Sequence, residues 1–188
     1  MLRSVYQRGK GKPTNEEPYD MDEKYLSKAF FKFLNRYIVV PAFKRGFGKL
    51  ISNPLTGRIM VLETIVRKTG KIRYTPVNYA LMDESIYCYQ GRHLKGKWYL
   101  NILANPQVEL LLPSRHLIGH AEEVSDPKEA AHAIRQILKA SGLGGFIYGF
   151  NPFTVTDDLL QKKTEGIPVI RIKPIHSAVT VSLRASTG

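Results

Sequence analysis

Three β-rich segments separated by short breaks constrain the fold of this chain more than any other feature. They are residues 58–66 (RIMVLETIV), 72–82 (IRYTPVNYALM) and 85–89 (SIYCY). Breaks this short favour hairpins, so the segments predict an antiparallel meander, with a glycine, Gly70, in the first break where a hairpin loop needs a left-handed residue. Pro76 lacks an N–H, which predicts an edge, a bulge or a bend at that point.

The rest of the chain adds strands and helices around this meander. Further strands are expected at 108–112, 117–122, 168–172 and 179–183, and helices at 21–40, 98–104, from Asp126 onward and at 157–163. Asp126 suits an N-cap and Pro127 the first helical position. Pro41 is expected to end or kink the first helix. About seven strands joined by short turns favour a mainly β (α+β) fold with flanking helices, its antiparallel sheet closed as a small barrel.

Length and composition predict one domain inside a cell. Residues 1–20 have no periodicity and are expected to be a mobile tail, and residues 21–188 a single domain. Apolar residues make up 43% of the chain, which excludes disorder, and the single cysteine, Cys88, excludes an internal disulfide. No stretch approaches the roughly 18 apolar residues of a membrane span, and we expect a cytoplasmic protein.

Positive charge is concentrated in the first half of the chain. The net charge is +12, and residues 1–100 carry 19 Lys and Arg against 8 Asp and Glu. Such a field attracts nucleic acid, anionic lipid or a small polyanionic ligand, and the total charge does not choose among them. No recognisable nucleic-acid motif is present, so a basic nucleic-acid-binding module is kept only as a distant alternative and no nucleic acid is expected.

The break between the first two segments combines a glycine turn with four cations. Arg67, Lys68, Lys71 and Arg73 surround Thr69 and Gly70. A glycine turn can direct successive backbone N–H groups toward one point, and with these cations it would form a cradle for a phosphate or carboxylate. A solvated basic hairpin tip is the alternative. A second basic loop with Arg92, Lys95 and Lys97 precedes the only tryptophan, Trp98, and in a meander the two loops can share one end of the sheet.

Two aromatic residues have both a structural and a functional interpretation. Trp98 is either a core anchor or a wall for a flat ring. Tyr148, between glycines, is either a buried tyrosine or a lid or proton donor. His93, His132 and His176 are scattered, His116 and His120 lie four apart on a predicted strand, and no metal site is expected. No P-loop, dinucleotide fingerprint or nucleophile elbow is present, so an enzyme of this sequence would rely on a bound cofactor.

Two elements in register resemble a known family. R-K-T-G-K-I-R-Y-T-P-V (67–77) and K-W-Y-L-N-I-L-A-N-P-Q-V (97–108) are similar to the signatures of the deazaflavin-dependent nitroreductases. The resemblance covers about residues 30–125. It implies a split β-barrel of the flavin- and deazaflavin-binding type, the coenzyme F-420, and hydride transfer from the reduced coenzyme to an electron-poor small molecule such as a nitro compound, an enone or a quinone.

The resemblance also implies roles for individual residues. Lys68, Thr69, Gly70 and Arg73, with Arg67, would hold the phosphate and acidic tail of the coenzyme. Pro76 and Val77 would run beside the deazaflavin ring, Trp98 would wall the pocket, and Tyr148 would stand at the substrate face as the candidate catalytic residue. The stretch before the tryptophan departs from the family pattern and reads Tyr89-Gln90-Gly91-Arg92-His93, so the contribution of Gly91 and Arg92 to cofactor binding is an extrapolation.

Two alternatives stay open beside this reading. An FMN-binding split-barrel oxidoreductase would use the same basic loop on a single phosphate. The predicted helix at 21–40 has an aromatic stripe beside Lys24, Lys28, Lys32 and Arg36, which suits either packing on the barrel or peripheral contact with an anionic membrane. The chain is expected to act on a small-molecule substrate as a monomer or homodimer.

Overall fold

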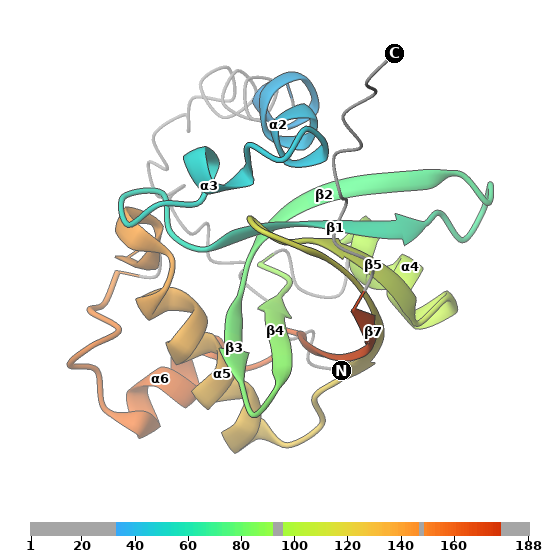
Figure 1. The fold of residues 1–188 in the computed structure, drawn as a ribbon. Coiled ribbons are helices and arrows are strands. Elements are labelled where there is room, and N and C mark those ends of the chain that lie inside the picture. The colour runs from blue at the N-terminus through green and yellow to red at the C-terminus, as the bar shows by residue number, and fades with distance from the viewer. Residues whose placement is uncertain (1–32, 92–95, 147–148, 178–188) are drawn as a thin grey trace, which may run out of the picture.

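The computed structural model describes residues 33–91, 96–146 and 149–177 and contains one sheet of seven strands (Figure 1). All pairings are antiparallel, and the strand order is β2-β1-β5-β6-β7-β4-β3. The strands are β1 (Ile59–Ile65), β2 (Ile72–Asn78), β3 (Ala80–Met82), β4 (Ser85–Tyr89), β5 (Gln107–Leu111), β6 (His116–Glu123) and β7 (Val169–Ser177). The predicted mainly β fold with flanking helices is confirmed.

The predicted strand at 72–82 is divided in two at Tyr79. Its first part, β2, pairs with β1 without a register shift, and its second part, β3, pairs with β4. The meander pairings are therefore correct, but the single strand was wrong because the chain changes partner at Tyr79, a buried residue whose N–H donates to the Arg58 carbonyl at 3.2 Å. Pro76 lies on the edge strand β2, as expected, with no bulge opposite it.

The other predicted hairpins and strands are present where the structure describes them. Asp83 and Glu84 both have positive φ, 46° and 61°, and join β3 to β4 by a two-residue turn. This is the geometry that matches the twist of a hairpin. The predicted strand at 179–183 lies outside the described residues, as do the predicted tail and most of the helix expected at 21–40.

Short helices flank the sheet. They are η1 (Asn35–Val39), α2 (Val40–Lys44), α3 (Gly48–Ile51), α4 (Lys97–Ala104), α5 (Pro127–Lys139), η3 (Gly142–Phe146) and α6 (Asp157–Thr164). The Asp126 side chain accepts from the N–H groups of Lys128 and Glu129, so the predicted cap is confirmed. Pro41 does not end its helix. The chain forms a π-turn before it, in which Val40 N–H bonds to the Asn35 carbonyl, and this wider turn accommodates the proline ring.

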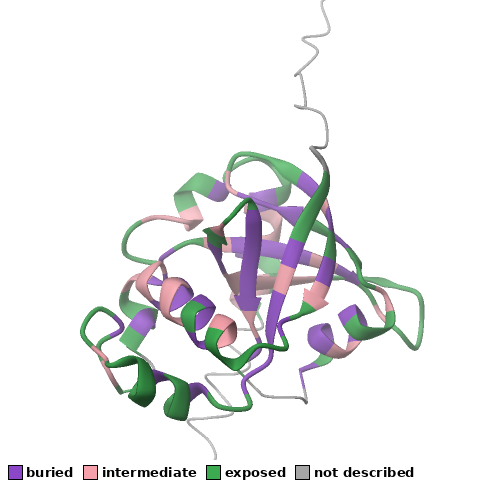
Figure 2. Ribbon diagram, turned by 90° about the horizontal axis from the view of Figure 1, so that it is seen from below, coloured by how far each residue is buried: buried purple, intermediate pink, exposed green. Residues whose placement is uncertain are grey.

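The helices bury three apolar clusters against the sheet. Val39 and Phe43 pack on Val61 and Leu111 beneath α2, whereas α5 covers β3, β4 and β7 on the other side of the molecule (Figures 1 and 2). The largest cluster joins the strands to Trp98, Tyr99 and Ile102 of α4. None of the helices in the described ranges combines the length and hydropathy that crossing a bilayer requires.

Candidate cofactor-binding site

The basic hairpin tip between β1 and β2 is fully displayed to solvent. Arg67, Lys68, Thr69 and Gly70 are all exposed, as are Lys71 and Arg73. Gly70 has a φ of 68°, which favours glycine, and a Cβ added there would meet no atom within 4 Å. No cation of this tip forms an ion pair within the described part of the chain. Their charges are therefore available to an external anion.

The backbone of the turn does not form the expected cradle of N–H groups. Thr69 and Gly70 both donate their N–H groups to the Val66 carbonyl, at 3.0 and 2.8 Å, and Val66 N–H donates to the Lys71 carbonyl. These bonds close the turn and use donors that were expected to face a ligand. The groups of this tip that stay free to face an anion are the cationic side chains.

Helix α4 supports the base of this hairpin through Asn101. The buried Asn101 side chain accepts from Arg67 N–H at 3.2 Å and donates from Nδ2 to the Thr64 hydroxyl at 3.3 Å. The helix itself begins at Lys97, directly after the second basic loop. This short helix thus places Lys97 on the element that supports the hairpin, whereas Arg92 and Lys95 lie outside the described residues.

The pairing of β2 with β1 assigns its side chains to two faces. Residues directly opposite each other in an antiparallel pair project to the same side. Arg73 lies opposite Thr64, and Val77 lies opposite Met60, on the face of the main core. Pro76 lies opposite Val61, on the face covered by α2. Val77 and Pro76, expected to flank one ring, therefore project in opposite directions.

Trp98 lies in the main core, with 7% of its surface exposed. Val77 packs against the same cluster, so these two predicted residues are brought together. Cys88 is fully buried in this cluster, and burial raises the pKa of its thiol to about 12. The thiol is protonated at neutral pH and behaves as the small apolar group that the sequence predicted.

The remaining predicted residues are only partly visible. Gly91 is an exposed turn residue after β4, and Arg92 and Tyr148 lie outside the described residues. A Cβ added to Gly96 would fall 1.7 Å from the Gln90 side-chain nitrogen, so a larger residue here would require the Gln90 side chain to move. Gln90 N–H also donates to the Pro168 carbonyl at 2.9 Å, which anchors the start of the loop to the segment before β7.

A protein-family model matches this chain over residues 37–142, more than half of its 188 residues. The model describes the F420H(2)-dependent quinone reductases. The chain belongs to this family. It is an oxidoreductase that uses coenzyme F420. The prediction of an F420-dependent reductase is therefore confirmed. The match contains both signature elements, the basic hairpin and α4.

Solved structures of similar proteins include F420 enzymes. A structure described as an F420-H2 dependent reductase (FDR-A) has 24% identity and a TM-score of 0.46, covering 65% of this chain and 99% of that one. An F420 reductase has 21% identity and a TM-score of 0.41, covering 67% and 93%. A chain described as a domain-swapped dimer has 20% identity and a TM-score of 0.47, covering 80% and 98%. Comparison with curated proteins gave no match.

The Thr75 hydroxyl bears on whether the residues of β2 fit the F420 coenzyme. Its hydroxyl oxygen is buried and has no hydrogen-bond partner among the described residues. It lies between Arg73 and Val77 on the core-side face, opposite Leu62. A buried hydroxyl without a partner is costly, and a polar ring edge or linker of a bound coenzyme would satisfy it. Sequence reasoning missed Thr75 and Asn101, although the asparagine lies within the tryptophan element.

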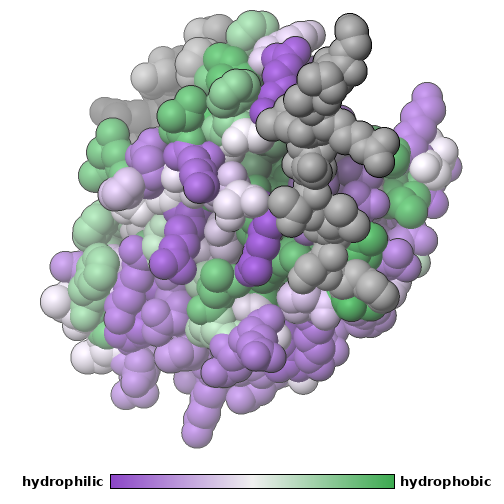
Figure 3. Space-filling view, in the orientation of Figure 1, coloured by the Kyte–Doolittle hydropathy of each residue, from purple (hydrophilic) through white to green (hydrophobic). Residues whose placement is uncertain are grey.

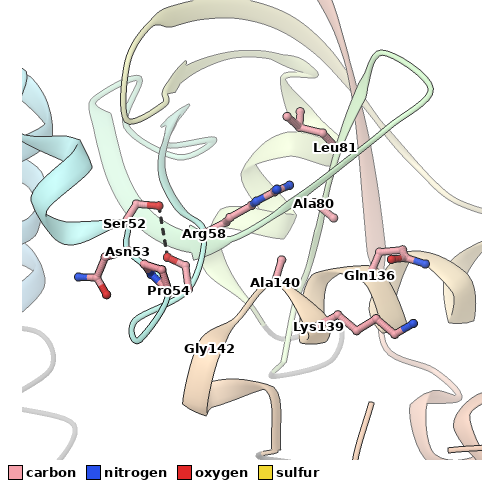
Figure 4. A pocket seen from close by; sticks show the side chains of 11 residues that line it. Ser52, Asn53, Pro54, Arg58, Ala80, Leu81, Gln136, Lys139, Ala140 and Gly142 are labelled. Atoms are coloured by element: carbon pink, nitrogen blue, oxygen red, sulfur yellow. Dashed lines mark hydrogen bonds between the residues drawn. The ribbon is translucent and has the colours of Figure 1, made fainter. Parts of the chain in front are cut away.

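Two cavities of about 600 Å³ each lie elsewhere in the described structure. The first lies between the 52–58 turn, β3 and the end of α5, and Figure 4 shows Arg58 extending into it toward Leu81, with Lys139 and Gln136 on the opposite wall. The second lies between α5, α6 and the end of β6. Neither lining includes a predicted site residue among the described residues.

Proposed function

We propose that this F420-dependent oxidoreductase transfers a hydride from reduced F420 to an electron-poor small molecule: a quinone, a nitro compound or an enone. The observation that carries the proposal is the composition of one face of β2. Arg73, the unpartnered Thr75 hydroxyl and Val77 follow one another there, from the exposed basic tip to the Trp98 cluster. This polarity gradient suits a molecule with an anionic tail and a flat, largely apolar head.

Each part of this face has a proposed task. Lys68 and Arg73, with Arg67, Thr69 and Gly70, hold the phosphate and acidic tail. Val77 and Trp98 give the ring an apolar wall, and Pro76, on the opposite face, stiffens the edge strand. Gly91, Arg92 and Tyr148 are proposed, from the resemblance alone, to complete the cofactor site and the substrate face.

The energetics require contributions from both ends of the coenzyme. Three charge-assisted hydrogen bonds, at roughly 1.5 to 3 kcal/mol each, give about 5 to 9 kcal/mol gross. Micromolar affinity needs about 8 kcal/mol net of the association costs. Tail contacts alone are insufficient on these magnitudes, so burial of the ring against Val77 and the Trp98 cluster must supply the remainder.

The chain's own contribution to the reaction is orientation and exclusion of water. Bound reduced F420 supplies the hydride, and no side chain is assigned as a covalent nucleophile. The β2 face fixes the coenzyme in one position, which replaces a bimolecular encounter by a preorganised one. Tyr148 is the proposed proton donor to the acceptor.

The proposed architecture is a split barrel. The two ends of the strand order, β2 and β3, are consecutive in the chain with only Tyr79 between them, and β2 also contacts β4. A sheet whose two outer strands are halves of one segment is bent back on itself by the chain. We propose that this bend produces the split barrel and leaves the β2 face accessible at its opening.

Fluorescence titration with F420 and with FMN tests the cofactor assignment. We expect saturable F420 binding and weaker FMN binding, because the cations of the tip exceed what a single phosphate requires. Tight FMN binding without F420 binding would establish the FMN alternative. A screen of quinones, nitroaromatics and enones with reduced F420 identifies the acceptor, and absence of turnover with all three classes would refute the proposed reaction.

The partner proposals are a small-molecule substrate, a monomeric or homodimeric state, and no nucleic acid. Light scattering on the purified chain decides between monomer and dimer. Tight binding to nucleic acid with a steep salt dependence would revive the nucleic-acid alternative. A cytoplasmic location with peripheral membrane contact completes the proposal.

A further inference from the structure

The cavity between the 52–58 turn, β3 and the end of α5 is not used by the proposed reaction. Its volume of about 600 Å³ lies in the range of pockets that hold small organic ligands. Figure 4 shows the two cationic side chains of its lining, Arg58 from the turn and Lys139 from α5. None of the described residues that line the cavity is an Asp or Glu. The charged side chains of this lining are therefore all positive.

Neither of these cations is neutralised by a carboxylate. Arg58 and Lys139 form no ion pair within the described part of the chain, although Lys139 lies 5.7 Å from the Phe153 ring centre. Arg135, one turn earlier on α5 and outside this lining, is paired with Asp157 at 2.7 Å. Unpaired positive charges in a recess attract an anionic ligand. The contrast along α5 therefore singles out the cavity as the place where an anion is lacking.

The wall that carries Arg58 is fixed before any ligand binds. Arg58 N–H donates to the Ala140 carbonyl at 2.7 Å, which ties the turn to the end of α5. The two backbones approach so closely that a Cβ added to Gly57, at a φ of 84°, would lie 2.4 Å from the Ser141 carbonyl carbon. A wall that is already ordered loses little conformational entropy when a ligand binds to it.

The backbone N–H groups of residues 52–58 are all occupied by bonds within the protein; Pro54 has none. The Asn53 side-chain carbonyl accepts from Leu55 and Thr56, for example, and its main-chain carbonyl accepts from Gly57. Phosphate sites typically use several such N–H groups. A carboxylate needs fewer donors, and its two oxygens match the fork of an arginine. The cavity therefore suits a carboxylate better than a phosphate.

Apolar side chains form another part of the lining. They belong to Pro54, Ala80, Leu81 and Ala140. Leu81 is 46% exposed, and covering it with an apolar group would remove this surface from water, which is favourable. On the side of the molecule formed by the turn and α5, Figure 3 shows hydrophilic side chains interspersed with apolar ones. The ligand that fits such a lining has a charged head and an apolar body.

We propose that this cavity binds a small organic carboxylate. The carboxylate pairs with the Arg58 guanidinium, and the apolar body lies on Leu81, with Gln136 and Lys139 on the opposite wall. Arg58 precedes β1 and the basic tip follows it, so the seven residues of β1, about 20 Å in length, separate the cavity from the tip. The inference goes beyond the proposed function, because the ligand is not F420 and its binding requires no coenzyme.

Calorimetric titration of the full chain with octanoate, in the absence of coenzyme, tests the proposal. We expect saturable binding of octanoate and at least tenfold weaker binding of octanol and octylamine, which keep the apolar body and lack the negative charge. Octyl phosphate should also bind more weakly than octanoate. Tighter binding of octyl phosphate, equal affinity for octanol, or absence of octanoate binding would overturn the proposal.

Variants with matched controls locate the site. Arg58→Met keeps the aliphatic stem and should weaken octanoate binding by about tenfold to a hundredfold, the range of one charge-assisted hydrogen bond. Gln136→Glu places a negative charge on the opposite wall and should also weaken binding. Arg45→Met on α2 and Gln161→Glu on α6, both at exposed positions, are the controls and should bind like the unaltered chain. Equal losses in variants and controls, or no loss in either variant, would overturn the assignment.

A titration in the presence of F420 separates this inference from the proposed function. Saturating F420 should leave the octanoate affinity unchanged, because the cavity and the basic tip lie at opposite ends of β1. If the chain binds F420 but not octanoate, only this inference fails. If it binds octanoate but not F420, only the proposed function fails. Displacement of octanoate by F420 would mean that the cavity belongs to the coenzyme site and that the inference is wrong.

Discussion

The two halves of the segment at 72–82 occupy very different surroundings. β3, the second half, pairs with β4 and is covered by α5. The negative charges of the carboxylates nearby are paired with an arginine. Arg171 bonds to Glu122 and Glu129 at 2.7 Å each, and Tyr87 donates to Glu129. β2, the first half, is an edge strand that carries an unpartnered hydroxyl and an exposed basic tip.

This difference separates stability from binding within one continuous stretch of chain. Groups whose hydrogen bonds and charges are already satisfied through α5 contribute to folding, and they have few free donors or acceptors for a ligand. Groups on β2 and its hairpin are left unsatisfied, which is typical of a surface that a ligand completes. The predictions below test this division.

The largest effect is expected from truncating the strand next to β3. Ile86, 1% exposed on β4, lies opposite Leu81, and Ile86→Ala should lower the free energy of unfolding by about 3 kcal/mol. Val77→Ala on half-buried β2 should lower it by only about 1 kcal/mol. Urea denaturation measures both values. Equal losses would show that β2 contributes as much to stability as the strand that pairs with β3.

The second effect concerns binding at the other half. Arg73→Glu should weaken F420 binding by about tenfold to a hundredfold, the range of one charge-assisted hydrogen bond, and leave the thermal midpoint unchanged because the side chain is exposed. Arg115→Glu, an exposed arginine in the β5–β6 turn, is the control for total charge. Fluorescence titration gives both affinities. Equal affinity in all three chains would remove the hairpin tip from the site.

The local elements could be read from the sequence because their signals are local. The Asp126 cap, the tight Asp83-Glu84 turn and α4 each depend on a few adjacent residues. The change of partner at Tyr79 depends on where two distant strands run, and no pattern in IRYTPVNYALM marks it. Seven strands were expected and seven are described, because the split of 72–82 adds one and the strand expected at 179–183 lies outside the described residues.

The candidate site was readable in its charges but not in its hydrogen bonds. Lysines and arginines can be recognised directly in the sequence, so the basic tip was identified. The N–H groups of Thr69 and Gly70 bond within the turn, which only coordinates reveal. Asn101 owes its role to a hydrogen-bond partner 37 residues away in the sequence. Thr75 owes its role to the absence of a hydrogen-bond partner among the described residues. No rule of local spacing reports either circumstance.

A matched pair of threonines sharpens the comparison further. Thr75→Val removes the unpartnered hydroxyl, so the free chain should be as stable as before or more stable by up to about 1 kcal/mol, while F420 binding weakens. Thr64→Val removes the acceptor of the Asn101 bond and should cost about 1 kcal/mol. Thermal unfolding with and without F420 measures these values. Loss of stability in Thr75→Val without ligand would mean that its hydroxyl is already satisfied.

The smallest effect is expected from two carboxylates on the β2 side. In the described part of the chain, neither forms an ion pair like those of Glu122 and Glu129 with Arg171. Glu63 on β1 lies directly opposite Glu109 on β5. Partial burial raises the pKa of the Glu63 carboxyl above 4.5, and the Glu109 charge adds to this, although Tyr74 and Lys44 oppose it. The folded chain therefore holds this proton more tightly than the unfolded chain. Its contribution to stability is present below pH 4.5 and is lost as the pH rises through the folded-state pKa.

Glu63→Gln removes this loss and keeps a side chain that can bond to Tyr74. Because Glu63 is only partly buried, solvent screens the effect, so the gain at pH 7 should be only roughly 0.3 kcal/mol, and it should vanish in acid, where both chains are neutral at this position. Urea denaturation at pH 3.5 and pH 7 measures the difference. A gain that is larger in acid than at pH 7 would contradict the raised pKa, and a Glu63→Gln chain less stable at pH 7 would show that the carboxylate is compensated after all, as Glu122 and Glu129 are on the α5 side.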